Sequence, residues 1–299
     1  MKRLCLLILT AALLALSAAS GETVLPGGDA LPLPLDLTPG MKLDKANYNT
    51  KYHYLDPTIR MDVREENYGD TKYWVAEVEI QHPSQLRTMP AYSFTRSSTA
   101  EGTKLSRRSN AVLAFNGDYW FRDAQWKGLY VLRQGTLYKS SITGETDVLL
   151  VDEEGDFHVI RKAAEEDVPM PETEGGPVYY EGKQIYNAFC FGPVLVEDGK
   201  VCEIEPNDKI VTDKKMARLA LCQTGKLKYA VVCSYKGSMT LQTFADLLGT
   251  LGVQTAYNLD GGNSAMLMTG KNMINYNPTT RELSDIIYFA SAWPGGASK

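Results

Sequence analysis

The chain has few of the residues that build metal centres and disulfide frameworks. It holds three histidines and five cysteines in 299 residues, and none of them shows the C-x-x-C or paired-histidine spacing of a zinc site. It also has no G-x-S-x-G and no P-loop sequence, which argues against an α/β-hydrolase and a nucleotide-binding loop. The formal net charge is −5, so we expect no nucleic-acid partner, because a phosphate backbone requires a basic excess.

Long hydrophobic runs are absent after the first residues. A positive start, Lys2-Arg3, precedes an apolar run over residues 4–16, and small residues follow it. This pattern is typical of a secretory signal peptide, which we assign to residues 1–19. We therefore expect a secreted or cell-surface protein with no transmembrane span in the mature chain. An uncleaved membrane anchor is the alternative interpretation.

Proline, glycine and leucine dominate the stretch that follows. Residues 20–45 include LPGGDALPLPLDLTPG, which indicates an extended linker. We predict a single domain over residues 46–299, whose composition is ordinary for a globular protein.

Secretion would leave four cysteines in the mature chain. Sequence cannot choose among the three pairings of Cys190, Cys202, Cys222 and Cys233. Cys190 and Cys202 flank a predicted hairpin and could meet. Alternatively all four are buried thiols, since a chain of this length needs no disulfides to fold.

Most of the predicted domain has the character of β-strands. Residues 73–80 (YWVAEVEI) alternate apolar and polar side chains, and residues 111–115 (AVLAF) form the short apolar run of a buried strand. Glycine-containing turns separate further pairs of strands, which predicts four hairpins. These hairpins span residues 129–138, 148–160, 194–204 and 218–235, and single strands are predicted over 255–259, 265–268 and 286–290.

One helix is clearly indicated after Thr240. Apolar residues recur at helical spacing over 241–248, Thr240 can cap the first turn, and Gly249 and Gly252 stand where such a helix ends. Residues 98–109 could form a second, polar helix. Many antiparallel hairpins with few helices predict an α+β fold, a single antiparallel-strand-rich domain.

Polar residues gather next to glycine at the end of the strand over 111–115. Asn116-Gly117-Asp118 follows this strand, and Tyr119 and Trp120 come next. An amide and a carboxylate suit sugar hydroxyls, and an aromatic ring can stack on a sugar face. Asn-Gly is also the strongest hairpin-turn signal, so a plain turn explains the segment as well.

The most informative motif is NLDGGNS, at the end of another predicted strand. Asp260 offers a carboxylate, Gly261 and Gly262 can expose backbone N–H groups, and Asn263 and Ser264 add an amide and a hydroxyl. Such a motif can hold an oxygen-rich anion against backbone donors, while a hairpin turn is the alternative.

Arg218 heads the apolar strand RLALC. Its planar guanidinium could bind a phosphate, whereas an arginine at a strand edge on the surface is the alternative. The segment Phe191-Gly192-Pro193 before another strand indicates a turn.

Taken in order, these segments resemble the phosphodiester glycosidase family. AFNGDYW, FGPVLVEDGK, RLALCQTGKLKYAVV and AYNLDGGNSAMLMTGKNMIN follow one another as in that family, and the resemblance covers residues 70–292. Its bacterial secreted members are the most similar. Asp118 and Asn263 stand where glycine is common, and Leu219-Ala220 follows Arg218 where Thr-Ala is usual. These departures bear on the substrate more than on the reaction class.

The resemblance implies a hydrolase that releases a sugar, similar to N-acetylglucosamine, from a glycosyl-1-phosphodiester and leaves a phosphomonoester. The expected substrate is a glycan or a cell-surface polymer, such as an exopolysaccharide or cell-wall polymer. For such a reaction we assign Asp260 as the base or nucleophile, Asp118 as the second carboxylate if one is needed, and Arg218 as the group that binds the phosphate. The substrate-binding positions that the family pattern implies are Asn116, Gly117, Gly261, Gly262, Ser264, Asn275 and Arg281. We add Asn263, whose amide suits sugar hydroxyls or phosphate oxygens.

Two other functions stay open. The chain could be a non-catalytic cell-wall or glycan-binding module that keeps the pocket without the chemistry. It could also be a phosphodiesterase that cuts the P–O bond. We expect no cofactor for the glycosidase, but a divalent cation such as calcium or magnesium is conceivable between Asp118 and Asp260.

Overall fold

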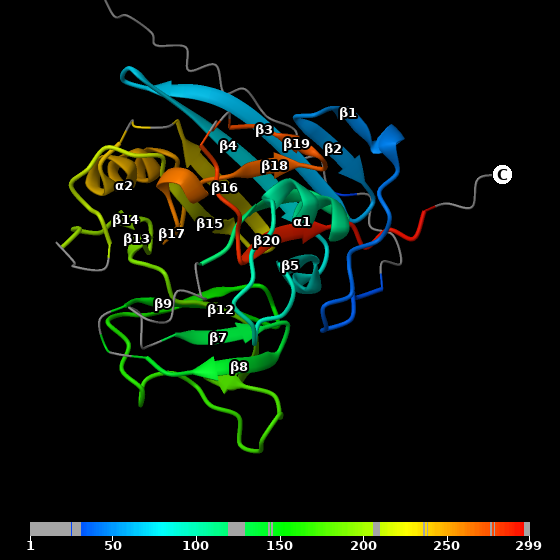
Figure 1. Cartoon of the computed structure of the whole chain (residues 1–299), viewed down its shortest axis with the longest axis vertical. Helices are drawn as coiled ribbons and strands as arrows, with labels where there is room; N and C mark the ends of the chain where they lie inside the picture. The colour runs from blue at the N-terminus through cyan, green and yellow to red at the C-terminus, as the bar shows by residue number, and fades with distance from the viewer. Residues whose placement is uncertain are drawn as a thin grey trace, which may run out of the picture.

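The computed structural model describes residues 25, 31–118, 129–142, 144, 146–205, 210–235, 237, 239–275, 277 and 279–295. The predicted signal peptide, Tyr119 and Trp120 lie outside the described residues. Within this part of the chain, three antiparallel sheets and two α-helices form the fold (Figure 1). No helix in the described part is long and apolar enough to span a membrane.

The largest sheet has nine strands and runs through the centre of the molecule. In sheet order its strands are β1 (Tyr48–Thr50), β2 (His53–Asp56), β3 (Ile59–Tyr68), β4 (Thr71–Ile80), β16 (Lys228–Ser234), β15 (Leu219–Gly225), β17 (Thr255–Leu259), β13 (Val194–Glu197) and β14 (Lys200–Val201).

A five-stranded sheet packs on one face of the nine-stranded sheet. Its strands are, in order, β19 (Asn272–Met273), β18 (Leu267–Thr269), β6 (Ala111–Asn116), β20 (Asp285–Ala290) and β5 (Leu86–Pro90). The two sheets share one buried cluster, in which Leu219 and Val231 of the large sheet meet Phe115 and Ile287 of the smaller one. This burial of apolar surface is the main force that holds the two layers together.

A six-stranded sheet forms the lower part of the view in Figure 1. Its strands are β10 (Phe157–Ile160), β9 (Val148–Asp152), β12 (Lys183–Phe189), β7 (Tyr130–Arg133) and β8 (Thr136–Ser140), with β11 (Tyr179–Tyr180) paired to β12. Alternate residues of β9 face different cores. Leu149 and Val151 join the cluster between the two other sheets, whereas Val148 and Leu150 join the core of this sheet.

The two helices cover the outer faces of the two packed sheets. Helix α2 (Leu241–Thr250) buries Phe244 and Leu248 against the nine-stranded sheet. Thr240 caps it as predicted, because its hydroxyl accepts the Thr243 N–H at 3.2 Å. Helix α1 (Gly102–Arg108) packs Leu105 against the five-stranded sheet. Three 3₁₀ turns complete the described elements: η1 (Lys45–Asn47), η2 (Pro83–Gln85) and η3 (Gly262–Ser264).

The predicted strands are all present, but their boundaries and the overall class needed correction. The hairpin over 218–235 turns at Lys226 and Leu227 rather than at Thr224-Gly225, because Gly225 still pairs with Lys228. The second helix is shorter than the predicted span of 98–109. Sequence patterns did not indicate β1, β2, β3, β5, β11, β12 or β19. With these strands added, the fold is predominantly antiparallel β, so the α+β description fits only loosely.

Residues 31–44, which precede η1, form no strand, but they pack along the domain. The buried Arg87 side chain of β5 donates hydrogen bonds to the carbonyls of Pro34 (3.0 Å), Asp36 (2.9 Å) and Thr38 (2.8 Å). Leu33 is buried in the cluster beneath α1. The described part of the predicted linker is therefore held against the five-stranded sheet.

All four cysteines of the predicted mature chain are free thiols, so the buried-thiol alternative describes them better than any disulfide. Cys190, Cys222 and Cys233 are buried and Cys202 is half-buried. Burial raises the pKa of the three buried thiols, which keeps them protonated.

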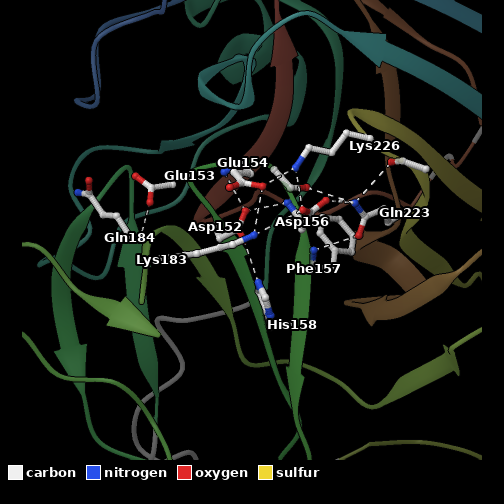
Figure 2. A network of polar contacts seen from close by, with 12 residues as sticks. Asp152, Glu153, Glu154, Asp156, Phe157, His158, Lys183, Gln184, Gln223 and Lys226 are labelled. Carbon is white, nitrogen blue, oxygen red and sulfur yellow. Dashed lines mark hydrogen bonds and ion pairs between the residues drawn. The ribbon is translucent and has the colours of Figure 1, made fainter. Parts of the chain in front are cut away.

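A polar network joins the six-stranded sheet to the nine-stranded sheet at the turn between β9 and β10 (Figure 2). Lys226, in the turn after β15, lies 3.0 Å from Glu154 and 2.8 Å from Asp156. Gln223 of β15 donates to Asp156 at 3.0 Å and accepts the Phe157 N–H at 3.0 Å. These contacts fix the position of the smaller sheet relative to the larger one.

Asp152 organises this turn from inside. Its fully buried carboxylate accepts the N–H groups of Glu154 and Asp156, both at 2.9 Å, and lies 2.9 Å from His158 Nε2 and 3.4 Å from Lys183 Nζ. Burial by itself would raise the pKa of Asp152, but the hydrogen bonds and the Lys183 charge outweigh it, so the pKa is lowered. The charged form is therefore the one that stabilises the fold.

We predict that Asp152→Asn destabilises the protein at neutral pH. The stabilisation from a lowered carboxyl pKa is complete above the unfolded value of about 3.9 and is lost as the pH falls through the folded value. The variant should lose about 1–3 kcal/mol of unfolding free energy at neutral pH, and its stability should fall less steeply in acid. Urea unfolding at neutral and acidic pH measures both. The exposed neighbour provides a control, since Glu153→Gln should change stability by less than about 0.5 kcal/mol.

Candidate active site

A cavity of about 460 Å³ opens where β17 ends and η3 begins, beside α2 in Figure 1. In the pairing of β15 with β17, Leu219 lies opposite Leu259. Arg218 immediately precedes Leu219, and Asp260 immediately follows Leu259. These two residues therefore lie beside each other at the same end of the sheet. Sequence-predicted residues on the cavity wall are Arg218, Asp260, Gly261, Gly262, Asn263, Ser264 and Arg281.

Asp260 is the only acidic side chain among the described residues that line this cavity. Its carboxylate is 15% exposed and forms an ion pair with Arg281, whose Nε also donates to Ser264 Oγ. Burial raises the pKa of Asp260, while the Arg281 charge and the hydrogen bonds from Ser264 and Arg281 oppose the rise. In the described part of the chain, no group of three or more His, Cys, Asp or Glu side chains could hold a metal ion.

Arg218 is built into the cavity wall. Arg218 is only 3% exposed. Its guanidinium donates to the carbonyls of Met239 (3.2 Å), Val211 (2.8 Å) and Lys214 (2.7 Å). Burial lowers the pKa of Arg218 to about 10, against the pull of Asp213, so the group stays cationic at neutral pH. Arg218 therefore shapes the segment 210–216 and gives the cavity a fixed positive charge.

The two glycines allow η3 to pack closely against the start of β15. A Cβ on Gly261 would lie 2.5 Å from the Ala217 carbonyl oxygen, and Gly262 has a φ of +56°. The Gly262 N–H donates to that same carbonyl at 2.8 Å. The expectation that Gly262 offers a free backbone N–H to a ligand is therefore wrong.

A further part of the cavity wall is formed by Arg281, Asn263 and Ser264. The Arg281 side chain is 32% exposed, and its backbone N–H donates to the Asn263 carbonyl at 3.1 Å. Asn263 is exposed and its amide oxygen accepts the Thr279 hydroxyl at 2.9 Å. Asn277, which sequence reasoning missed, donates to the Gly262 carbonyl at 3.1 Å and secures the turn.

Asn116 and Asn275 lie behind the cavity and not on its wall. Asn116 of β6 donates to the Asp260 carbonyl at 2.8 Å and accepts the Met266 N–H at 3.1 Å. Asn275 accepts the Leu267 N–H at 2.6 Å and donates to the Ala265 carbonyl at 2.9 Å. Both amides are buried, so they hold the backbone on either side of η3.

Asp118 and Gly117 belong to a buried charge cluster. One oxygen of Asp118 pairs with Arg133 and the other accepts the Cys190 N–H at 2.9 Å. Both side chains have no exposed surface. Arg133 also lies 3.6 Å from Asp285, and a Cβ on Gly117 would overlap the Asp285 carboxyl group. The structure thus separates Asp118 from the cavity that contains Asp260.

Asp285, at the start of β20, was not predicted as a site residue because the sequence shows it only as the residue before an apolar strand. It is fully buried, and neither oxygen has a hydrogen-bond partner within the described residues. Burial and the nearby Asp118 charge raise the pKa of Asp285 well above its usual range, while Arg133 opposes the rise.

Phe191 and Asn258 are cavity residues that sequence reasoning did not select. The side chain of Asn258 donates to the Gly192 carbonyl at 2.7 Å, and its N–H donates to the Pro193 carbonyl at 3.1 Å. These bonds hold the turn over 191–193, predicted only as a turn, at the cavity edge. The apolar part of the cavity lining is formed by Phe191, Ile210, Val211 and Met216.

We predict that Asp285→Asn flattens the dependence of stability on pH. A raised carboxyl pKa means that the folded chain keeps a proton that the unfolded chain releases. Unfolding free energy therefore falls as pH rises above about 3.9. The variant should lose less stability than the parent between about pH 5 and 8 in urea unfolding. Parallel curves for the two proteins would contradict the assignment. Asp118→Asn should instead destabilise throughout, because it leaves Arg133 without its closest carboxylate.

Comparisons with known proteins identify the family and the fold of this chain. The profile of the phosphodiester glycosidase family matches residues 109–290, which include every described residue of the cavity wall. No curated protein matches the sequence.

Two solved structures share the fold. The first is the catalytic domain of zebrafish N-acetylglucosamine-1-phosphodiester alpha-N-acetylglucosaminidase, auto-inhibited by its pro-peptide, with a TM-score of 0.60 and 16% identity over 88% of this chain and 98% of that one. The second is a hypothetical protein from Synechocystis, with a TM-score of 0.55 and 16% identity over 77% of this chain and 62% of that one. Because the family profile covers more than half of the sequence, the chain belongs to the phosphodiester glycosidase family.

Proposed function

We propose that this protein hydrolyses a glycosyl-1-phosphodiester, releasing the sugar and leaving a phosphomonoester. One observation carries the proposal: among the described residues of the cavity wall, one carboxylate, Asp260, lies with two guanidinium groups, Arg218 and Arg281. Hydrolysis of an ordinary glycoside commonly uses two carboxylates, one of which protonates the leaving oxygen. A phosphate leaves as a stable anion, so cations near it matter more than a second acid.

Asp260 is the group that we assign to the anomeric carbon. Its carboxylate would act either as the base that activates water or as the nucleophile. A partly desolvated carboxylate with a raised pKa is a stronger base than one in water, which suits both roles.

Arg281 is the group that we assign to the phosphate. It is the more exposed of the two arginines and already donates to Asp260 and Ser264. A bound phosphate would take over part of this hydrogen bonding and leave Asp260 directed at the sugar carbon. Arg218 would contribute its charge from within the wall.

The sugar is expected to contact the polar edge and the apolar wall of the same cavity. Asn263 and Ser264 offer an amide and a hydroxyl, and Phe191 offers an aromatic face for stacking. A sugar similar to N-acetylglucosamine is supported by family membership and by the activity for which the zebrafish relative is named. We assign Asp118 as a buried positioning residue, because both of its oxygens are occupied and it has no exposed surface.

Export completes the proposal. The signal-peptide pattern over residues 1–19 supports a secreted or cell-surface protein, whose substrate would be a glycan or cell-surface polymer carrying sugar phosphodiesters.

The reaction products test this function. The mature protein would be incubated with an N-acetylglucosamine-1-phosphodiester, with and without a chelator. Free sugar and a phosphomonoester would support the glycosidase. Sugar 1-phosphate formed only without chelator would identify a metal-dependent phosphodiesterase instead. Saturable binding without any product, for this and other sugar phosphodiesters, would identify a binding module.

We predict that Asp260→Asn lowers kcat by about 10²-fold or more, since it removes the only carboxylate assigned to the reacting carbon. Its melting temperature should stay close to that of the parent, because the amide keeps the size and can still accept from Arg281. Asp246→Asn is a matched control, as Asp246 is exposed on α2 and contacts only Gln242 among side chains. Full activity in a folded Asp260→Asn protein would exclude Asp260 from the chemistry.

A further inference from the structure

A second cleft, of about 400 Å³, lies at the other end of the five-stranded sheet from the active site. Ala111, the first residue of β6, lines it, whereas Asn116 at the other end of β6 contacts Asp260. Six residues of strand place the two ends roughly 17 Å apart. The cleft is bounded by α1, by the segment over 42–51, and by the turn between β18 and β19, which lie together in Figure 1.

The cleft is strongly basic. Its lining includes five cationic side chains and no carboxylate, although the whole chain has a net charge of −5. The cationic residues are Lys42, Lys45, Lys51, Arg107 and Lys271, and all five are exposed.

None of these five cations forms an ion pair with a carboxylate of the described residues. The hydrogen bond recorded for an Arg107 side-chain nitrogen goes to the Thr103 carbonyl of its own helix, at 3.3 Å, and Lys51 lies 4.7 Å from the centre of the Tyr52 ring. The nearest acidic residue in sequence, Asp44, is not part of the lining and caps η1 by accepting the Ala46 N–H. The Glu65 carboxylate, whose pKa is lowered chiefly by Lys72 and also by the Lys51 charge, is a counter-charge near the cleft. Gathering five like charges in one hollow still costs free energy, which an anionic ligand would recover.

The lining of the cleft is mostly apolar, but Tyr48 and Thr269 place hydroxyl groups in it. Tyr48 donates its hydroxyl to the Val112 carbonyl at 3.1 Å and packs edge-on against Tyr54. Gly270 allows the tyrosine close, since a Cβ there would lie 3.2 Å from the Tyr48 oxygen. The hydroxyl of Thr269, a buried lining residue, has no partner among the described residues. The site is thus a hollow lined by five cationic side chains, and not a set of lysines on a flat surface.

We propose that this cleft is a non-catalytic binding site for an anionic polymer with repeating phosphate groups other than nucleic acid. Five cationic side chains line one hollow, and their combined charge exceeds what a single phosphate can neutralise. That this polymer is the one whose sugar phosphodiester is cut rests on the proposed function. In that case the cleft holds the chain while the cavity at Asp260 acts on it, which increases the local concentration of substrate.

Binding of long-chain inorganic polyphosphate to the full mature protein tests the site without any turnover. Calorimetric titrations would compare the parent with K45Q/R107Q and with R96Q/K200Q, which removes two exposed cations that do not line the cleft. The cleft variant should bind at least about tenfold more weakly and lose about two units of slope in log affinity against log salt, whereas the control should match the parent. Circular dichroism confirms that each variant is folded.

Three outcomes would overturn the proposal: no binding by the parent, equal weakening in both variants, or tighter binding of single-stranded nucleic acid than of polyphosphate. A separate measurement addresses the link to catalysis. With a polymeric phosphodiester substrate, K45Q/R107Q should raise KM and leave kcat unchanged, and a small phosphodiester should show no difference. Absence of turnover would defeat the proposed function, while the polyphosphate result would still decide the binding site.

Discussion

The antiparallel pairing of β15 with β17 is the constraint on which the site depends. Because Leu219 lies opposite Leu259, Arg218, which precedes β15, and Asp260, which follows β17, emerge side by side at one sheet end. A shift of one residue would turn the apolar side chains of the strand toward the wrong core and separate Arg218 from Asp260. The position of the cavity is therefore maintained by the same burial that stabilises the sheets.

Behind this end of the sheet, buried charged side chains hold the backbone in position. Arg133 lies between Asp118 and Asp285, and all three side chains are removed from water. Buried ion pairs contribute little net stability, but they define one arrangement strongly, because every alternative leaves a charge without a partner. Asn116 and Asn275 act in the same way without charge. The cavity thus has an inner layer of oriented polar groups, which limits how far Asp260 can move.

Local patterns predicted much of the fold, and chain order predicted much of the site. The helix after Thr240 and the strand before Asp260 follow from periodicity, which depends only on neighbours in sequence. The class was less well predicted, because half-buried strands such as β3 and β12 acquire their pairing from distant partners. The same limit explains Asp118: a carboxylate after a buried strand suggests a site residue, and only the three-dimensional position of Arg133 shows it as part of the interior.

The hydrogen bonds of Arg87 indicate which residues belong to the folded domain. The Arg87 guanidinium is buried beneath the segment over 31–44 and donates to three carbonyls of that segment. A chain that started at residue 46 would keep every strand, yet it would expose apolar surface around Leu33 and would leave the Arg87 guanidinium only two acceptors among the described residues, the Ser84 carbonyl and the Tyr288 hydroxyl. The described part of the proline-rich stretch, residues 31–44, is thus an outer wall of the domain.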